Sequence, residues 1–333
     1  MKTRLLSLFA LVTLFACSGA TCARYPAPPQ ILQASPTLEQ IELAVNTNSA
    51  HVLSLDAPNA SLSGTGFPTL RTSLAFDRPR RIRMRAETGF TGPEVDLGSN
   101  DELFWFWVKR STPPALYFCR HDQLAISNFR QIMPVEPEWL IEALGVTTFD
   151  PAVTSQGPFP VHGGRLEIRS PRSSAAGNFT KITVVDEKTA IVLEQHLYDA
   201  KGTRIATAMT SNPRYFPEYQ ASMPQQVDIE WPANQVHLHL DLNDYQLNTL
   251  HNVPSPLWQK PEYPGFANVD LARPNGFSGP VVEPPLAKSV LPASANLPLT
   301  PEANPGPTPS AKPETPTEVF VPKAVLSPIV GEK

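Results

Sequence analysis

Hydrophobic and polar residues alternate in short segments over most of the chain, which predicts β-strands. From residue 60 onward the apolar positions recur with a period of two, and the segments are separated by Gly, Pro and Asn-Asp breaks. This rhythm is typical of an antiparallel meander. We expect strands at 61–67, 70–79, 80–87, 94–98, 101–110, 115–122, 164–170, 179–187, 189–199, 204–211, 225–232 and 235–244.

Two segments show helical rather than strand periodicity. In residues 37–55, Thr37 and Gln40 form a capping-box pattern, and the apolar residues that follow keep roughly helical spacing. Residues 137–145 predict a short helix that ends at Gly145. Strands and helices do not alternate steadily, so a parallel α/β sheet is not expected.

The predicted fold is therefore mainly β, of the α+β type. A sheet of about ten strands must curl or close. We expect a large curled antiparallel sheet, a half-open β-barrel, with the helices covering its concave side.

Residues 101–110, DELFWFWVKR, break the alternation expected of a strand with one wet face. By parity, Leu103, Trp105 and Trp107 share one face of the strand, while Phe104 and Phe106 share the other. Both faces must then be covered. The pattern does not indicate which face borders the concave side.

Composition sets the limits of the folded part. The chain has 333 residues and 38 prolines, which are spread unevenly: from Arg273 onward roughly one residue in four is Pro, and aromatic residues are almost absent there. Such a segment cannot bury enough apolar area to offset its ordering entropy. We expect a signal peptide at 1–16, a lipidated Cys with a Pro-rich tether at 17–36, a β domain at 37–255 and an extended, disordered Pro-rich tail at 256–333.

The N-terminus carries the most specific signal in the chain. Two basic residues precede an apolar run that is too short to span a bilayer, and the run ends in Leu14-Phe15-Ala16-Cys17. This looks like a bacterial lipobox, which implies a diacylglycerol on Cys17 and cleavage before it. The alternative is an ordinary secretory signal cut nearby. Ser18 stands where an Asp retains proteobacterial lipoproteins in the inner membrane, so we expect the outer membrane.

Two other cysteines, Cys22 and Cys119, remain. Export permits a disulfide between them. A buried free thiol at Cys119 is the alternative.

Residues 74–107 resemble part of a known protein family. LAFDRPRRIRMRAE, then a short strand, then Gly98-Ser-Asn-Asp-Glu-Leu-Phe-Trp-Phe106, resembles the LolA/LolB-like lipoprotein carrier superfamily. The chain would be an anchored bacterial lipoprotein variant of that superfamily. The resemblance implies a half-open barrel with a helical lid and an apolar cavity for acyl chains, and it implies no enzymatic activity.

The resemblance also implies a cavity and its mouth. In the carriers, the Arg of the Arg-Pro pair closes the mouth by hydrogen bonds to lid loops. Arg78 is the matching residue here, and parity places it on the same face as the apolar residues before it. The predicted cavity and mouth residues are Arg78, Leu74, Phe76, Ile82, Met84, Trp105, Trp107, Phe104 and Phe106.

Other polar patterns point to surfaces rather than to catalysis. Arg81, Arg83 and Arg85 lie opposite the apolar residues of their strand, which predicts a basic outer ladder or a contact with anionic headgroups. His237 and His239 share a polar face, but no further ligands complete a metal site. No Gly-x-Ser-x-Gly occurs, so we expect no catalytic residue, no metal and no cofactor.

Charge narrows the class of partner. The net charge of −4 argues against binding to nucleic acid. The first hypothesis is a membrane-anchored envelope lipoprotein, monomeric, that binds acyl chains of lipids or lipoproteins as a carrier, receiver or sensor. The alternative is a structural or interaction lipoprotein with a filled core, whose Pro-rich tail binds a partner in the envelope.

Overall fold

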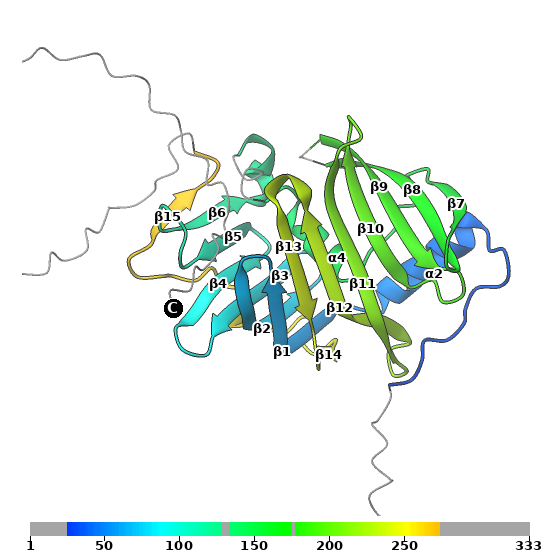
Figure 1. The fold of residues 1–333 in the computed structure, drawn as a ribbon, viewed down its shortest axis with the longest axis horizontal. Helices are drawn as coiled ribbons and strands as arrows, with labels where there is room; N and C mark the ends of the chain where they lie inside the picture. The colour runs from blue at the N-terminus through cyan, green and yellow to red at the C-terminus, as the bar shows by residue number, and fades with distance from the viewer. Residues whose placement is uncertain (1–24, 128–132, 175–176, 274–333) are drawn as a thin grey trace, which may run out of the picture.

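One open sheet of 15 strands dominates the computed structural model, which describes residues 25–127, 133–174 and 177–273 (Figure 1). The strands follow the order β15 (Ala267–Asp270), β6 (Ala115–Arg120), β5 (Leu103–Val108), β4 (Gly92–Ser99), β3 (Arg81–Thr88), β2 (Phe67–Asp77), β1 (Ser54–Gly64), β13 (Val236–Asp241), β12 (Ala221–Trp231), β11 (Arg204–Phe216), β10 (Val192–Asp199), β9 (Gly177–Asp186), β8 (Arg165–Ser174) and β7 (Gln156–Val161). The short β14 (Gln246–Leu247) pairs with β1.

The sheet joins two meanders that are far apart in the sequence. β1 to β6 form one antiparallel series and β7 to β13 the other, and β1 pairs with β13 through Ser61 opposite Asp241. The two end strands, β7 and β15, do not pair with each other, so the sheet stays open. The predicted large, mostly antiparallel and unclosed sheet is therefore confirmed; only β15 and β6 run parallel.

The first helix begins where the sequence predicts and ends earlier. α2 (Leu38–Ala50) starts with the expected capping box between Thr37 and Gln40. The extension of this helix to residue 55 is wrong, because Ser54 already begins β1. The side chain of Asn248 accepts hydrogen bonds from the backbone N–H groups of Leu53 and Ser54, which holds the turn into the strand.

The second predicted helix is also present, as α4 (Pro137–Ala143). Three short 3-10 helices, η2 (His121–Ile126), η3 (Pro232–Asn234) and η4 (Pro256–Trp258), complete the described elements. None of the helices in the described ranges is long and apolar enough to cross a bilayer.

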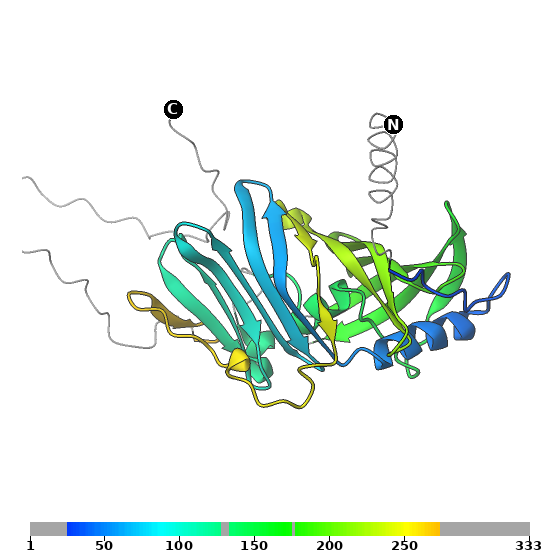
Figure 2. The same ribbon diagram turned by 90° about the horizontal axis from the view of Figure 1, so that it is seen from below.

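Both α-helices cover the same face of the sheet, which we call the concave face. Ile41 and Val45 of α2 pack on Ile168 of β8 and Val185 of β9. α4 packs on the main core cluster, which extends through β1 to β4 and β10 to β12. Cross-strand register places both sets of strand residues on one side of the sheet, and Figure 2 shows α2 beside its β7–β9 end.

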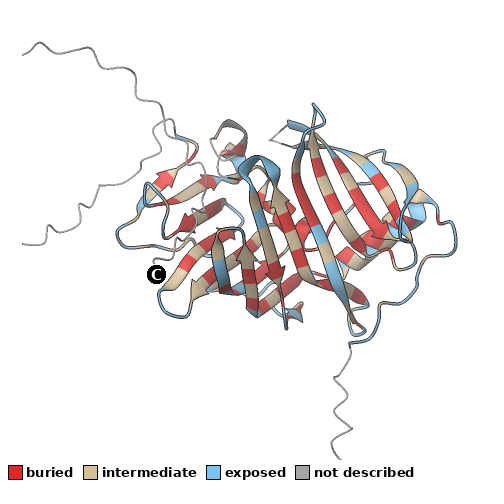
Figure 3. Ribbon diagram, in the orientation of Figure 1, coloured by how far each residue is buried: buried red, intermediate tan, exposed pale blue. Residues whose placement is uncertain are grey.

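The opposite, convex face of β3 to β6 has a cover of its own. Trp105, Trp107 and Leu116 form a buried cluster there with Tyr263 and Phe266 from the C-terminal segment. We call residues 255–271 the strap; the gold segment of Figure 1 runs to β15 beside β6. Red segments of the ribbon in Figure 3 mark the buried residues of these strands.

The strap corrects the predicted boundary of the Pro-rich tail. Residues 256–270 form η4 and β15 and pack against the sheet, although their composition assigned them to an extended tail. The three aromatic side chains of Trp258, Tyr263 and Phe266 supply the apolar area that the later part of the tail lacks. The rest of the predicted tail, 274–333, lies outside the described residues.

Gly98 is required by the packing of Trp105 on the convex face. The indole ring lies across the Gly98 backbone, and a Cβ added at Gly98 would overlap ring atoms. Gly98→Ala must therefore displace a fully buried Trp, and it should lower the free energy of unfolding by about 1–3 kcal/mol. Urea denaturation measures this. Gly89→Ala is the matched control, since a Cβ at Gly89 would meet only open space, and an equal loss in both variants would contradict the packing argument.

Candidate functional site

Arg78 ties the turn after β2 to the end of α2. Its guanidinium Nη1 donates to the carbonyl oxygens of Ser49 at 2.5 Å and Val52 at 3.5 Å, and its backbone N–H donates to the Leu53 carbonyl at 2.9 Å. Carbonyls at the end of a helix lack intrahelical partners and carry a partial negative charge, which favours a cation. Burial lowers the pKa of Arg78, which still stays charged at neutral pH. The side chain therefore fastens α2 to the sheet.

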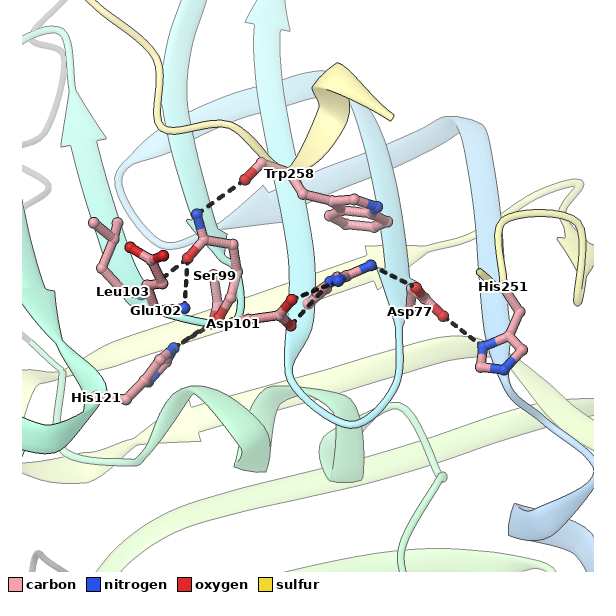
Figure 4. Close-up of polar contacts among 10 residues, drawn as sticks. Asp77, Ser99, Asp101, Glu102, Leu103, His121, His251 and Trp258 are labelled. Atoms are coloured by element: carbon pink, nitrogen blue, oxygen red, sulfur yellow. Dashed lines mark hydrogen bonds and ion pairs between the residues drawn. The ribbon is translucent and has the colours of Figure 1, made fainter. Parts of the chain in front are cut away.

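A chain of polar contacts continues from this turn along the same edge (Figure 4). Arg81 donates to Asp77 at 3.3 Å and to Asp101 at 2.9 Å, so it links the β2–β3 turn to the β4–β5 turn. Asp77 is almost fully buried and lies 2.8 Å from Nδ1 of His251. The loop that precedes the strap is thereby attached to the edge that holds Arg78.

The hydrogen bonds of Asn100 explain why the Ser99-Asn100-Asp101 part of the motif forms a turn. Its Oδ1 accepts from the backbone N–H groups of Glu102 and Leu103, both at 2.9 Å, and its Nδ2 donates to the Trp258 carbonyl at 3.1 Å. His121 approaches the Asn100 carbonyl at 2.9 Å through Nε2. Figure 4 shows these contacts converging on the turn. The motif positions a turn and the strap.

The predicted cavity residues separate onto two faces. Most of them belong to the main core cluster on the concave side or pack against it: Leu74, Phe76, Ile82, Met84, Phe104 and Phe106. Trp105 and Trp107 lie on the convex side beneath the strap, so their assignment to one cavity with the others is wrong. Successive strand residues point to opposite faces, and all four aromatic residues could not share one.

On the concave side, α4 occupies the space that a cavity would need. Trp139, Ile141 and Leu144 are nearly fully buried in the main core cluster. Beside the helix lies a cleft of about 250 Å³, including open solvent, that is lined by Pro134, Val135, Glu136, Trp139, Arg172, Phe179 and Leu197. Even this upper bound, which counts open solvent, lies below the roughly 300–1,000 Å³ of ligand pockets. This cleft is therefore too small for a long acyl chain while α4 stays in place.

Charged side chains lie buried between α4 and the sheet, and the sequence patterns did not reveal them. Arg172 of β8 donates to both carboxylate oxygens of Glu142 on α4, each at 2.7 Å, and Lys181 of β9 donates to the same carboxylate at 2.6 Å. Burial lowers the pKa of Lys181. Burial also opposes ionisation of Glu142, but the two cations outweigh it and hold the pKa of Glu142 below its ordinary value. A Lys within the apolar run of residues 179–185 was the available signal.

A second buried charge organises the convex face. Asp96 is fully buried and accepts from Arg83 at 2.7 and 3.1 Å, from Trp105 Nε1 at 3.2 Å and from the Tyr263 hydroxyl at 2.6 Å. Burial and the bond to Asp96 raise the pKa of Tyr263. Arg83 also donates to two strap carbonyls. The predicted exposed ladder is therefore wrong for Arg83, although Arg85 stays exposed.

The histidine pair of β13 and the cysteines were also singled out by the sequence patterns. His239 Nδ1 lies 2.8 Å and His237 Nε2 3.7 Å from one oxygen of Asp228 across β12 and β13. In the ranges that the structure describes, no three His, Cys, Asp or Glu side chains form a group that could hold a metal ion. Cys119 is buried with a free thiol. Cys17 and Cys22 lie outside the described residues.

Comparison with known proteins finds similar folds among solved structures. No protein-family model and no curated protein matches the sequence. The structure resembles a domain described as an outer membrane lipoprotein-sorting protein from Vibrio parahaemolyticus, at 10% identity and a TM-score of 0.46, covering 66% of this chain and 95% of that one. It also resembles a DUF1329 family protein from Desulfovibrio piger, at 12% identity and a TM-score of 0.45, covering 66% and 95%.

A third similar structure is a LolA superfamily protein from Nitrosomonas europaea, at 11% identity and a TM-score of 0.43, covering 68% of this chain and 99% of that one.

Replacing Arg78 tests whether it fastens α2. Arg78→Gln loses the charge-assisted hydrogen bonds to Ser49 and Val52, and we expect about 1–3 kcal/mol less stability in urea denaturation. Amide hydrogen exchange should rise in residues 47–54. Arg80→Gln is the matched control, because its ion pair with Glu138 is part-exposed and is worth about 0–1 kcal/mol. Equal effects of the two substitutions would remove the special role of Arg78.

Proposed function

We propose that the protein binds acyl chains of lipids or lipoproteins on the concave face of its sheet, in the place that α4 occupies. One observation carries this proposal: a single apolar cluster runs over the concave surface of both meanders, and α4 packs onto it together with the chain on either side of the helix. α4 itself has only seven residues, and Met133, Val135, Leu144 and Val146 add to this cover. The motif of residues 74–107 supports the same function.

Displacing α4 with an acyl chain exchanges one apolar cover for another. Burial of apolar surface is favourable by about 25 cal/mol per Å² whichever group supplies it, so the hydrophobic term of the exchange is close to zero for a chain taken from water. Transfer of a chain from a membrane gains little from this term, so the apolar face that α4 exposes must then be covered by the membrane or by a partner. With that cover the energy balance allows the protein to take up and release lipid, and direction comes from partners. Arg78 keeps α2 fixed while α4 moves.

A fully exposed aromatic residue supports contact with a membrane. Phe90, at the tip of the β3–β4 hairpin, has a relative exposure of 102%. The tip is held by the hydrogen bond from the Thr91 N–H to Thr88 Oγ1, and Lys109 donates to the Thr91 carbonyl at 2.7 Å. An apolar side chain beside basic residues suits the boundary between headgroups and acyl chains. We propose that this hairpin rests on the membrane during exchange.

Lipidation of Cys17 remains part of the proposal, with the envelope as its location. The described chain begins at Tyr25, whose ring lies 3.8 Å from the Arg214 guanidinium carbon. Tyr25 is eight positions after Cys17, and eight extended residues span at most about 28 Å. An acylated Cys17 would therefore keep the folded domain within reach of the membrane surface.

The filled concave side favours a second candidate function. If α4 does not move, the buried side chains of Trp139 and Ile141 leave no room for a lipid. The protein would then be a structural or interaction lipoprotein of the envelope. The two functions differ in whether lipid co-purifies with the folded protein.

Native mass spectrometry of gently purified protein should show bound lipid on the wild type. Leu197→Gln places an amide beside the cleft, which should weaken acyl binding about tenfold, since burying an unpaired polar group costs about 1–3 kcal/mol. Met209→Gln, on a part-exposed residue of β11, is the control and should retain lipid. Repeated absence of lipid from all three proteins would favour the structural function.

Removing the Phe90 ring should weaken attachment to vesicles. In the unacylated mature chain with Cys17→Ser, Phe90→Ser should lower partitioning onto anionic vesicles roughly tenfold or more, because burial of a Phe is worth about 1.5–3 kcal/mol. Flotation of vesicles with bound protein measures the partition. Phe159→Ser, at a part-exposed Phe on the edge strand β7, is the control. Unchanged flotation of Phe90→Ser would exclude the hairpin from the contact.

A further inference from the structure

Two cations of the sheet face the concave side beneath α4. Arg172 lies opposite Phe179, and Lys181 lies opposite Leu197, in the cross-strand register of β8, β9 and β10. Phe179 packs against the main core cluster and Leu197 belongs to it, so all four side chains share the concave face. The side chain of Lys181 is only 9% exposed. Two basic groups therefore lie within an otherwise apolar surface.

The anion that neutralises both cations belongs to the helix rather than to the sheet. Glu142 contacts Arg172 at 2.7 Å and Lys181 at 2.6 Å. Glu136, just before α4, lies 3.8 Å from Arg172. Lys181 also donates to the Thr147 hydroxyl, which follows the helix. If α4 leaves the concave face, its carboxylate leaves with it. An acyl chain that then covers Arg172 and Lys181 without supplying an anion would bury unpaired cations, which is strongly unfavourable.

Two further polar atoms in the same place lack a partner among the described residues. Thr183 and Gln195 lie directly opposite each other on β9 and β10. Thr183 is two residues along β9 from Lys181, so the two share a face. Both side chains are almost completely buried, and Thr183 Oγ1 and Gln195 Oε1 have no hydrogen-bond partner. Buried polar atoms are normally satisfied by protein, water or ligand. The concave face thus offers a polar patch next to an apolar one.

We infer that the lipid taken up on the concave face is an anionic amphiphile, whose carboxylate or phosphate replaces Glu142 between Arg172 and Lys181. This inference rests on the proposed function and adds the class of its ligand. The acyl chain would lie over Phe179 and Leu197, which line the cleft beside Arg172. Thr183 and Gln195 would meet the polar groups that join headgroup to chain. Glu142 would then occupy the headgroup position in the lipid-free protein.

Binding of matched lipids tests the ligand class. The full mature chain is titrated with a fatty acid, a lysophosphatidic acid and a neutral monoacylglycerol of equal chain length, each below its critical micelle concentration. Isothermal titration calorimetry should give at least tenfold tighter binding for both anionic lipids. A preference for lysophosphatidic acid alone identifies a phosphate, and an equal preference identifies any compact anion. Equal binding of anionic and neutral lipids would overturn the inference while leaving the proposed function intact.

Variants assign the preference to the two cations. Arg172→Gln with Lys181→Gln should remove the preference for anionic lipids and keep binding of the neutral lipid. Glu142→Gln removes the internal anion and loosens α4, so it should tighten binding of anionic lipids severalfold more than binding of the neutral lipid. Because the double variant can fail to fold, Glu142→Gln provides the independent result. No gain in Glu142→Gln would contradict the inference.

A control on the opposite face of the sheet distinguishes a binding site from general electrostatic attraction. Arg165→Gln with Arg169→Gln removes the same charge from the opposite face, where both side chains are exposed, and should leave the preference unchanged. A loss of preference in this control would show general electrostatic attraction instead of a site. Failure of every lipid to bind the wild type would refute the proposed function itself.

Discussion

Burial on both faces of an open sheet is the constraint on which this structure depends. A closed barrel hides its interior by itself, whereas β5 and β6 carry apolar side chains on each side and need a cover for each. α4 supplies the concave cover, and the strap supplies the convex one. Each cover comes from a segment distant in sequence from the strands it protects, so neither meander is complete alone.

Buried ion pairs decide where the covers attach. Apolar contact would let α4 or the strap settle in many positions, because the hydrophobic effect has no direction. Glu142 fixes α4 over β8 and β9, and Asp96 with Arg83 and Tyr263 fixes the strap over β3 and β4. The two attachments differ in consequence. Asp96 bonds within the sheet as well as to the strap, whereas Glu142 carries the only carboxylate in the described structure that contacts both cations beneath α4.

Local patterns predicted the elements, and long-range packing decided the rest. Period-two alternation identified most of the strands but not β7 or β15, and the Thr37–Gln40 box located the start of α2. Parity separated Phe104 from Trp105, but it could not tell the concave from the convex side. The burial of Arg83 and Lys181 depends on partners from the strap and from α4, which are far away in the sequence. The start of the Pro-rich tail was predicted too early in the sequence, because the high proline content outweighed three aromatic residues that pack on the sheet.

The pairing of β1 with β13 has a consequence for the order of assembly. Ser61 meets Asp241 only after most of the chain exists, and such distant contacts slow folding because the loop between them must first close. Each meander can form locally through its own hairpins, so the pairing of β1 with β13 that joins the two meanders forms late. A chain that emerges N-terminus first would expose the unpaired edge of β1 until residue 241 arrives. The domain thus depends on a period of assistance, or of unhindered time, before its sheet is complete.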